Sequence, residues 1–120
     1  MEQNQVVYNL VQELHRGVVV LAVLSQLQNE QYGYSVMKIL AERGLDVDQG
    51  TLYPLLRRLE TQGLLESRWR IEEARPRRYY AISAKGRQML PILKEEWSKI
   101  VRTVEPLLYG EDRSKENGTD

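Results

Sequence analysis

The most constraining feature of this sequence is a leucine stripe near its middle. Four leucines recur at the i, i+3, i+4, i+7 spacing that places side chains on one side of an α-helix: Leu52, Leu55, Leu56 and Leu59. This face is predicted to be buried in a core. The other face carries polar, aromatic and basic residues that a small core does not need: Gln49, Gly50, Thr51, Tyr53, Arg57 and Arg58. Such residues suit a phosphate-lined groove, so this helix is the candidate nucleic-acid-binding element.

The ends of this helix are marked by capping residues. Asp48 is a candidate N-cap, and Gly63 is a candidate for the left-handed residue that follows a helix. Pro54 lacks an N–H, so the helix either begins late, near Thr51, or bends slightly in its first turns. The residues leave both alternatives open.

Basic residues are concentrated around this helix, although the whole chain is neutral. The 120 residues, enough for one domain, contain 17 Lys and Arg and 17 Asp and Glu. Residues 51–90 hold nine Lys and Arg against four Asp and Glu, so the acidic excess lies in the rest of the chain. A segregated positive charge is typical of a surface that binds a polyanion.

Several classes of protein are disfavoured by what the chain lacks. It has no cysteine and a single histidine, His15, so we expect no disulfide, no metal site and no cofactor. No Ser/His/Asp set, glycine-rich phosphate loop or isolated carboxylate pair indicates an enzyme. The longest apolar run, Val18 to Leu24, is shorter than the ~18 residues that span a bilayer, and the N-terminus lacks a basic signal-peptide region. We therefore expect a cytoplasmic protein with no membrane partner.

Two helices are expected before the leucine stripe. Residues 5–28 have helical periodicity, with Gly17 as a candidate break, and residues 35–43 form a second helix that ends at Gly44. A short glycine-containing turn then leads to a helix with polar and basic residues on its outer side, which is typical of a helix-turn-helix.

A β-hairpin is predicted after the leucine stripe. Residues 64–70 and 77–83 alternate apolar and polar side chains, and residues 71–76 between them are interpreted as a tip too long for a two-residue turn. A hairpin at this place is a wing, and three arginines suit a minor groove or its flanking phosphates: Arg75, Arg77 and Arg78. Of Tyr79 and Tyr80, one is expected in the core and the other on the wing surface.

The last helix is expected from Ala84 to about Glu105, with Ser83 as its N-cap and Pro106 beyond its end. Pro91 is expected either to bend it or to mark where its regular part begins. Its apolar residues form a heptad seam: Leu90, Leu93, Trp97, Ile100, Val104 and Leu107. The first helix offers a second stripe, which includes Val7, Leu10 and Val11. Neither stripe has an obvious cover within so short a chain, so a homodimer is expected.

Three segments resemble the PadR family of bacterial transcription regulators. They are YGYSVMK at 32–38, GTLYPLLRRLE at 50–60, and RRYYAIS at 77–83 followed by Lys85 and Gly86. The resemblance implies a homodimeric winged helix-turn-helix that binds an inverted-repeat operator in double-stranded DNA and usually represses. It also places Tyr34 among the candidate DNA contacts. One departure is the run Glu73-Ala74-Arg75-Pro76, because the family commonly has glycine at the wing tip.

The expected fold is mainly α with a small β-hairpin. We predict an N-terminal helix (1–14), a winged helix-turn-helix domain (15–83), a dimerisation helix (84–109) and a disordered polar tail (110–120). Some members of the family bind flat aromatic compounds at the dimer interface, so Trp97 is either a platform for such an effector or, as we favour, a seam residue packed against its symmetry mate. The alternative function is a protein-interaction adaptor that uses the winged helix without reading DNA.

Overall fold

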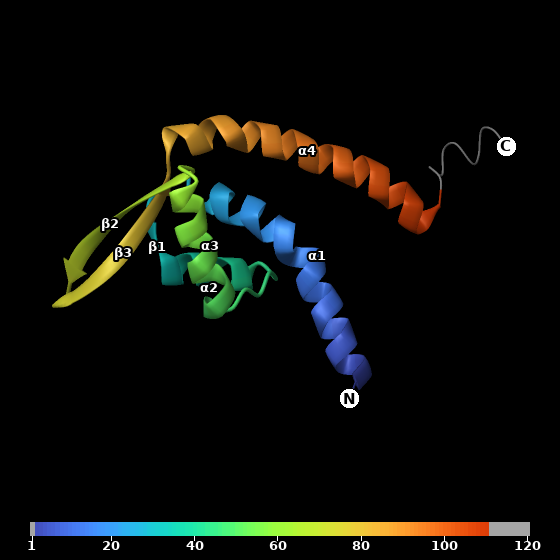
Figure 1. The fold of residues 1–120 in the computed structure, drawn as a ribbon, viewed down its shortest axis with the longest axis horizontal. Coiled ribbons are helices and arrows are strands. Elements are labelled where there is room, and N and C mark those ends of the chain that lie inside the picture. The colour runs from blue at the N-terminus through green and yellow to red at the C-terminus, as the bar shows by residue number, and fades with distance from the viewer. Residues whose placement is uncertain (1, 111–120) are drawn as a thin grey trace. The chain divides into compact units, whose positions relative to one another are not determined.

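The computed structural model describes residues 2–110. Four helices are present, namely α1 (Glu2–Gln26), α2 (Gly33–Glu42), α3 (Gln49–Thr61) and α4 (Ala84–Tyr109), together with the strands β1 (Gln31–Tyr32), β2 (Leu65–Glu72) and β3 (Arg75–Ile82) (Figure 1). Residues up to Leu90 form one compact unit and residues from Pro91 onward belong to a second, so α4 begins in the first unit and continues in the second. Part of the predicted tail, residues 111–120, lies outside the described residues.

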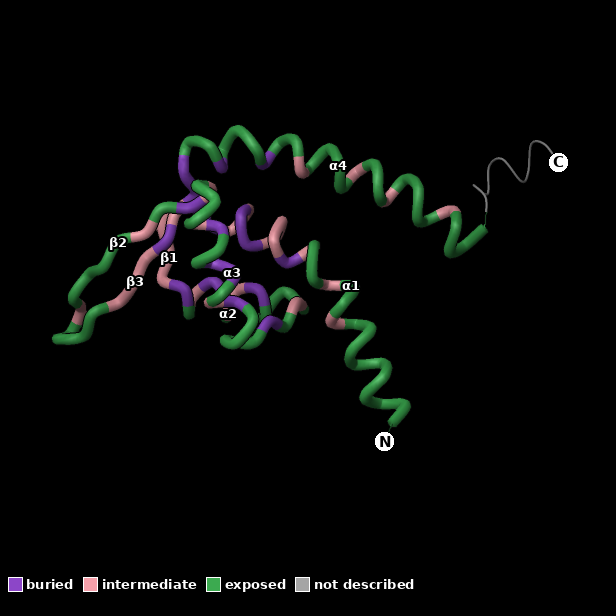
Figure 2. Tube along the Cα trace, viewed as in Figure 1, coloured by how far each residue is buried: buried purple, intermediate pink, exposed green. Residues whose placement is uncertain are grey.

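The core of the first unit is aliphatic and centred on α3. All four leucines of the stripe are buried, as predicted, and the side chains of Val23, Leu24 and Leu27 from the first helix and the turn after it are fully enclosed. Figure 2 shows this buried region on α2, α3 and the second half of α1. Each fully buried aliphatic side chain contributes about 1.5–3 kcal/mol, so these residues fix α3 in the unit.

The first helix is continuous through Gly17, so the candidate break there was wrong. A Cβ at Gly17 would meet nothing within 4 Å, which means that no close packing demands glycine at this position. By length and composition alone α1 could cross a membrane, with a mean hydropathy of 1.3 over its most apolar 18-residue window, of which 11% is buried. A core helix passes the same test, and α1 contributes Val19, Val23 and Leu24 to the core.

The start of α3 is set by its N-cap, as predicted. The Asp48 carboxylate accepts a hydrogen bond of 2.8 Å from the Thr51 backbone N–H, and the helix begins at Gln49. Pro54 therefore lies inside the helix and not before it. At the other end, Gly63 takes φ of +84°, which confirms it as the left-handed residue that ends the helix.

The hairpin differs from its prediction in two ways. Its turn is only two residues long, because the strands pair up to Glu72 and Arg75, and the turn residues Glu73 and Ala74 have φ of +53° and +64°. In addition, the two-residue strand β1 was not predicted. It pairs with β3 at Tyr79 and Tyr80 and completes a three-stranded antiparallel sheet in the order β1-β3-β2.

The first turn of α4 closes the unit. The Ser83 hydroxyl accepts a 3.0 Å hydrogen bond from the Gly86 N–H and donates one of 2.6 Å to the Gly63 carbonyl, so Ser83 is the predicted N-cap and also joins two segments. The helix does not stop before Pro106 but continues to Tyr109, which corrects the expected end near Glu105.

Candidate nucleic-acid interface

The outer face of α3 carries the side chains that the sequence predicts as DNA contacts. Gln49, Gly50 and Thr51 are exposed in its first turn, where free N–H groups and the positive end of the helix dipole attract phosphate. Arg57 and Arg58 are exposed further along. Within residues 2–110 neither guanidinium has a carboxylate within ion-pair distance, so both charges are available.

Tyr53 is held against α2 by a glycine. A Cβ at Gly33 would lie 3.2 Å from the Tyr53 ring, so a larger residue at the start of α2 would push this ring aside. Burial, followed by the nearby hydroxyls of Tyr32 and Tyr34, raises the pKa of Tyr53 above its usual value. The hydroxyl therefore stays protonated at neutral pH and can donate a hydrogen bond. Tyr34 is exposed, and its ring centre lies 6.3 Å from that of Tyr32.

A cleft separates α3 from the hairpin and brings candidate residues from both together. Tyr53 and Arg57 line it from α3, and Arg77 lines it from β3. Trp69 on β2 also lines this cleft with 61% of its side chain exposed, and Ile71 further along the strand is 79% exposed. Neither residue is among the contacts that the sequence predicts. Ile71 falls in the segment predicted as the hairpin tip. It shares a face of β2 with Trp69 and the buried Leu65, so it is exposed because it lies farther along the strand from the core.

Arg78 does not lie free on the wing. Its guanidinium donates a 2.9 Å hydrogen bond to Glu60 on α3 and one of 3.1 Å to the Ser67 hydroxyl, which itself donates to the other Glu60 oxygen at 2.7 Å. These three residues form a closed ring between the helix and the hairpin. Arg78, a predicted DNA contact, therefore differs from Arg57 and Arg58, because its charge is compensated by a carboxylate of the protein.

The outer face of the sheet holds further arginines in internal pairs. Glu30 accepts hydrogen bonds from Arg68 and Arg70, and the Arg68 hydrogen bond is the main cause that lowers the pKa of Glu30 below its usual value. The Arg70 guanidinium lies 4.4 Å from the centre of the Tyr79 ring. The Tyr79 hydroxyl donates a 2.7 Å hydrogen bond to Glu72, which raises the pKa of Tyr79.

Arg75 and Arg77 are the wing arginines that remain most available. Arg75 next to the turn is exposed and has no ion pair within the described part of the chain. Arg77 lies 5.0 Å above the Tyr32 ring and only at the 4.0 Å limit from Glu72. Of the two tyrosines, Tyr80 is the core residue with 5% exposure and Tyr79 lies on the sheet surface.

The candidate dimer residues are exposed in the single chain with two exceptions. In the first half of α1, Val7, Leu10 and Val11 are 58%, 59% and 38% exposed. Four residues of the α4 seam are also exposed, namely Trp97, Ile100, Val104 and Leu107, and Leu93 is half-buried. Leu90 differs, since only 4% of it is exposed and it belongs to the core of the first unit. No group of three His, Asp or Glu in residues 2–110 could hold a metal ion.

Proteins with the same fold and similar sequences include transcription regulators. The family model described as the transcriptional regulator PadR-like family matches residues 20–91. The chain is 36% identical to the Mycobacterium tuberculosis protein named transcriptional regulator Rv3488, over 91% of this chain and all of that protein.

Solved structures agree with this match. A PadR family transcriptional regulator from Eggerthella lenta superposes with a TM-score of 0.81 at 42% identity, covering 90% of this chain and 96% of that one. A PadR-like transcriptional regulator from Bacillus cereus gives a TM-score of 0.72 at 32% identity over 82% and 99% of the two chains. With its winged-helix fold, this chain belongs to the PadR-like family of transcriptional regulators.

Proposed function

We propose that the protein is a homodimeric repressor of the cytoplasm that binds an inverted-repeat operator through α3 and the hairpin. The observation that carries this proposal is the distribution of arginines that have no internal partner. Arg57 and Arg58 on α3, Arg75 beside the hairpin turn and the weakly paired Arg77 are available to phosphates. The other hairpin arginines, Arg68, Arg70 and Arg78, are bound to carboxylates.

In this proposal α3 enters the major groove and the hairpin contacts the adjacent backbone or minor groove. Two copies related by a two-fold axis would place their α3 helices about 34 Å apart, one turn of B-DNA. The first turn of α3 approaches a phosphate through the backbone N–H groups of Gln49 and Gly50 and through the Thr51 side chain, because the Thr51 N–H is bonded to Asp48. Tyr34 and Tyr53 add hydroxyl donors beside it.

Arg78 is assigned a positioning role and not a DNA contact. Its bonds to Glu60 and Ser67 tie the hairpin to the helix that would read the bases. A fixed spacing between α3 and the hairpin matters for DNA binding. In the proposed complex α3 must reach the major groove while the hairpin reaches the adjacent backbone or minor groove.

The proposed dimer uses both apolar stripes. The first half of α1 and the exposed α4 seam leave large aliphatic side chains in water, which a second copy would cover. Trp97 is assigned to this seam, where it packs against the partner. An aromatic effector that binds at Trp97 is the alternative, and quenching of Trp97 fluorescence by planar aromatic compounds in a Trp69→Phe background would support it.

A gel-shift titration on the DNA upstream of the gene tests the DNA-binding proposal. Arg57→Ala and Arg77→Ala should each weaken binding about tenfold or more in a dimer, because two charged contacts are lost per variant. Arg43→Ala, which removes an exposed arginine at the C-cap of α2, is the matched control and should bind like the parent. Equal affinity of all four proteins would remove the site assignment.

Light scattering after size-exclusion chromatography tests the dimer. The parent chain should have twice the monomer mass, and Ile100→Glu should lower the dimer population because it places a charge in the seam. A parent chain that is monomeric at DNA-binding concentrations would exclude this assembly. A stable dimer without salt-sensitive DNA binding would instead favour the adaptor function.

A further inference from the structure

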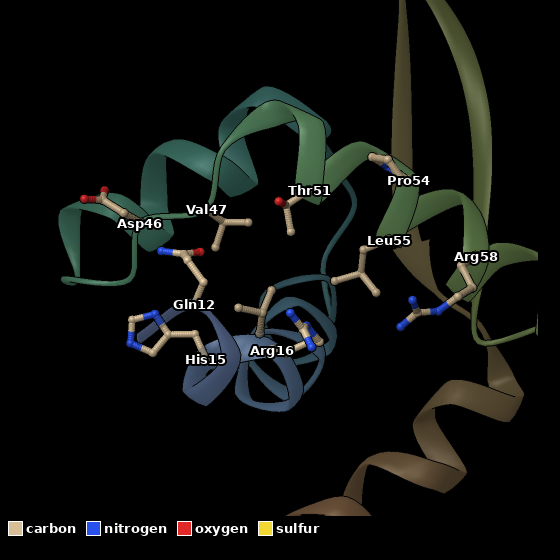
Figure 3. A pocket seen from close by; sticks show the side chains of 10 residues that line it. Gln12, His15, Arg16, Asp46, Val47, Thr51, Pro54, Leu55 and Arg58 are labelled. Atoms are coloured by element: carbon tan, nitrogen blue, oxygen red, sulfur yellow. The ribbon is translucent and has the colours of Figure 1, made fainter. Parts of the chain in front are cut away.

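A cavity between α1 and α3 lies beside the proposed DNA-binding face and shares Thr51 and Arg58 with it. Its floor is apolar and consists of Val19, Val47, Pro54 and Leu55. Its polar lining comes from both helices and from the turn before α3: Gln12, His15, Arg16, Asp46, Thr51 and Arg58. Figure 3 shows Arg16 on α1 and Arg58 on α3 facing each other across the space between the two helices, whereas the His15 ring and the Asp46 carboxylate point away from them.

The charge of the cavity favours an anion. Arg16 on α1 and Arg58 on α3 both line it, and neither has a carboxylate partner within residues 2–110. Asp46 is the only acidic lining residue, and in Figure 3 its carboxylate points away from both guanidinium groups. Two like charges that share a cavity repel each other, so a bound anion that accepts hydrogen bonds from both would relieve this repulsion.

His15 lies at the edge of the cavity. Its Nδ1 atom is buried and has no hydrogen-bond partner within the described part of the chain. Because this atom has no accessible surface, a ligand in the cavity does not bond to it, and His15 is a reporter of the cavity and not part of the anion site. The apolar floor would accommodate the body of a small molecule, as in most ligand sites.

We propose that this cavity binds a small organic anion, a carboxylate or a phosphate monoester with a compact apolar body, as an effector. The anionic group lies between Arg16 and Arg58, and the apolar body lies against Val19 and Leu55. Because Arg58 is also a proposed phosphate contact of α3, an occupied cavity withdraws one charge per subunit from DNA. This regulatory consequence rests on the proposed DNA-binding function, whereas ligand binding does not.

The single histidine provides a specific reporter of this cavity. We would follow the His15 ring resonances by NMR in the full-length protein during titration with cyclohexanecarboxylate and, separately, cyclohexyl phosphate. At least one of the two ligands should give a saturable shift. Comparison of their Kd values shows whether the cavity prefers a carboxylate or a phosphate. The neutral cyclohexanecarboxamide should give none. Arg16→Gln should weaken the apparent Kd at least fivefold, whereas Arg43→Gln, outside the cavity, should leave it unchanged.

The outcomes separate ligand binding from regulation. The proposal would be overturned if neither anion shifted the His15 resonances, as expected if a second copy fills the cavity. It would also be overturned by an equal shift with the amide or by an unchanged Kd in Arg16→Gln. In the gel-shift experiment a saturating anion should weaken DNA binding at least threefold in the parent and not in Arg16→Gln. Unchanged DNA affinity with the anion bound would overturn the effector role. If the parent binds no DNA, the NMR titration still decides the cavity.

Discussion

The Arg78 guanidinium on β3 lies 2.9 Å from the Glu60 carboxylate near the end of α3. The two side chains are 34% and 29% exposed, so the pair is neither fully solvated nor fully buried. Ser67 on β2 bonds to both partners and closes the ring. A contact that joins a helix to both strands of a hairpin fixes the position of the hairpin relative to that helix, which a single surface ion pair would not do.

Glu60→Gln should therefore lower the free energy of unfolding by about 1 kcal/mol and accelerate amide hydrogen exchange in the hairpin. Arg78→Gln should have a similar effect, and the double variant should cost less than the sum of both because the pair is lost only once. Urea denaturation and hydrogen exchange measure these changes. Glu66→Gln, an exposed residue of the same hairpin, is the control. Strictly additive losses would show that the two residues act independently.

DNA binding should be strongly salt-dependent. Four available arginines per subunit, Arg57, Arg58, Arg75 and Arg77, would neutralise about eight phosphates in a dimer, so the logarithm of the binding constant should fall with the logarithm of salt concentration with a slope near −7. Arg57→Ala should reduce this slope by about 2, because one contact is lost in each subunit.

Arg78→Ala is the informative comparison in this salt titration. In the parent the Arg78 charge is already compensated by Glu60, so its removal should leave the salt slope close to that of the parent. The affinity itself should fall only because the hairpin is displaced. Fluorescence anisotropy between 50 and 300 mM salt separates these two effects. A slope that falls as much for Arg78 as for Arg57 would return Arg78 to the set of phosphate contacts.

Local signals in the sequence were sufficient to predict the caps and faces of the helices. The Asp48 carboxylate and the Ser83 hydroxyl act within three residues of their own positions, and the stripe of four leucines needs only the periodicity of one helix. The same holds for Gly63, whose positive φ is the usual requirement after a helix.

The features that the sequence did not predict depend on distant residues. Strand β1 has two residues and exists because Gln31 and Tyr32 pair with a strand almost 50 positions later. The Glu73–Ala74 turn has positive φ at both residues but lacks the glycine that usually signals such a turn. The pairing of the flanking strands imposes this conformation. The pairing of Arg78 was also not predicted, because its partner Glu60 lies 18 residues away on another element.

Gly86 should be the least replaceable glycine in the described part of the chain. A Cβ at this position would lie 2.3 Å from the Leu64 carbonyl oxygen, which is backbone and cannot move aside without breaking its hydrogen bond from the Ser83 N–H. Gly86→Ala should therefore destabilise the fold by roughly 2–4 kcal/mol. Thermal and urea unfolding measure the loss.

Gly17→Ala is the matched control for Gly86→Ala. Gly17 also lies in a helix, but a Cβ there would meet nothing within 4 Å. The substitution should stabilise the protein by up to about 1 kcal/mol, because alanine loses less conformational freedom on helix formation. If Gly86→Ala were as stable as Gly17→Ala, the close approach of α4 to the Leu64 carbonyl would be wrong.

Acidification should weaken the outer face of the sheet through Glu30. Hydrogen bonding and charge from Arg68, with a further contribution from Arg70, lower the pKa of Glu30 below its usual value of 4.5. A carboxyl group with a lowered pKa in the folded state stabilises the protein above its unfolded pKa, and this contribution is lost as the pH falls through the folded value.

Carbon-13 NMR of the carboxyl groups should therefore give Glu30 a midpoint below 4.5. Glu30→Gln should make the thermal midpoint fall less steeply below pH 5 than in the parent, whereas Glu66→Gln should not. A Glu30 midpoint at or above its usual value would mean that the two arginines are not bound to it in solution.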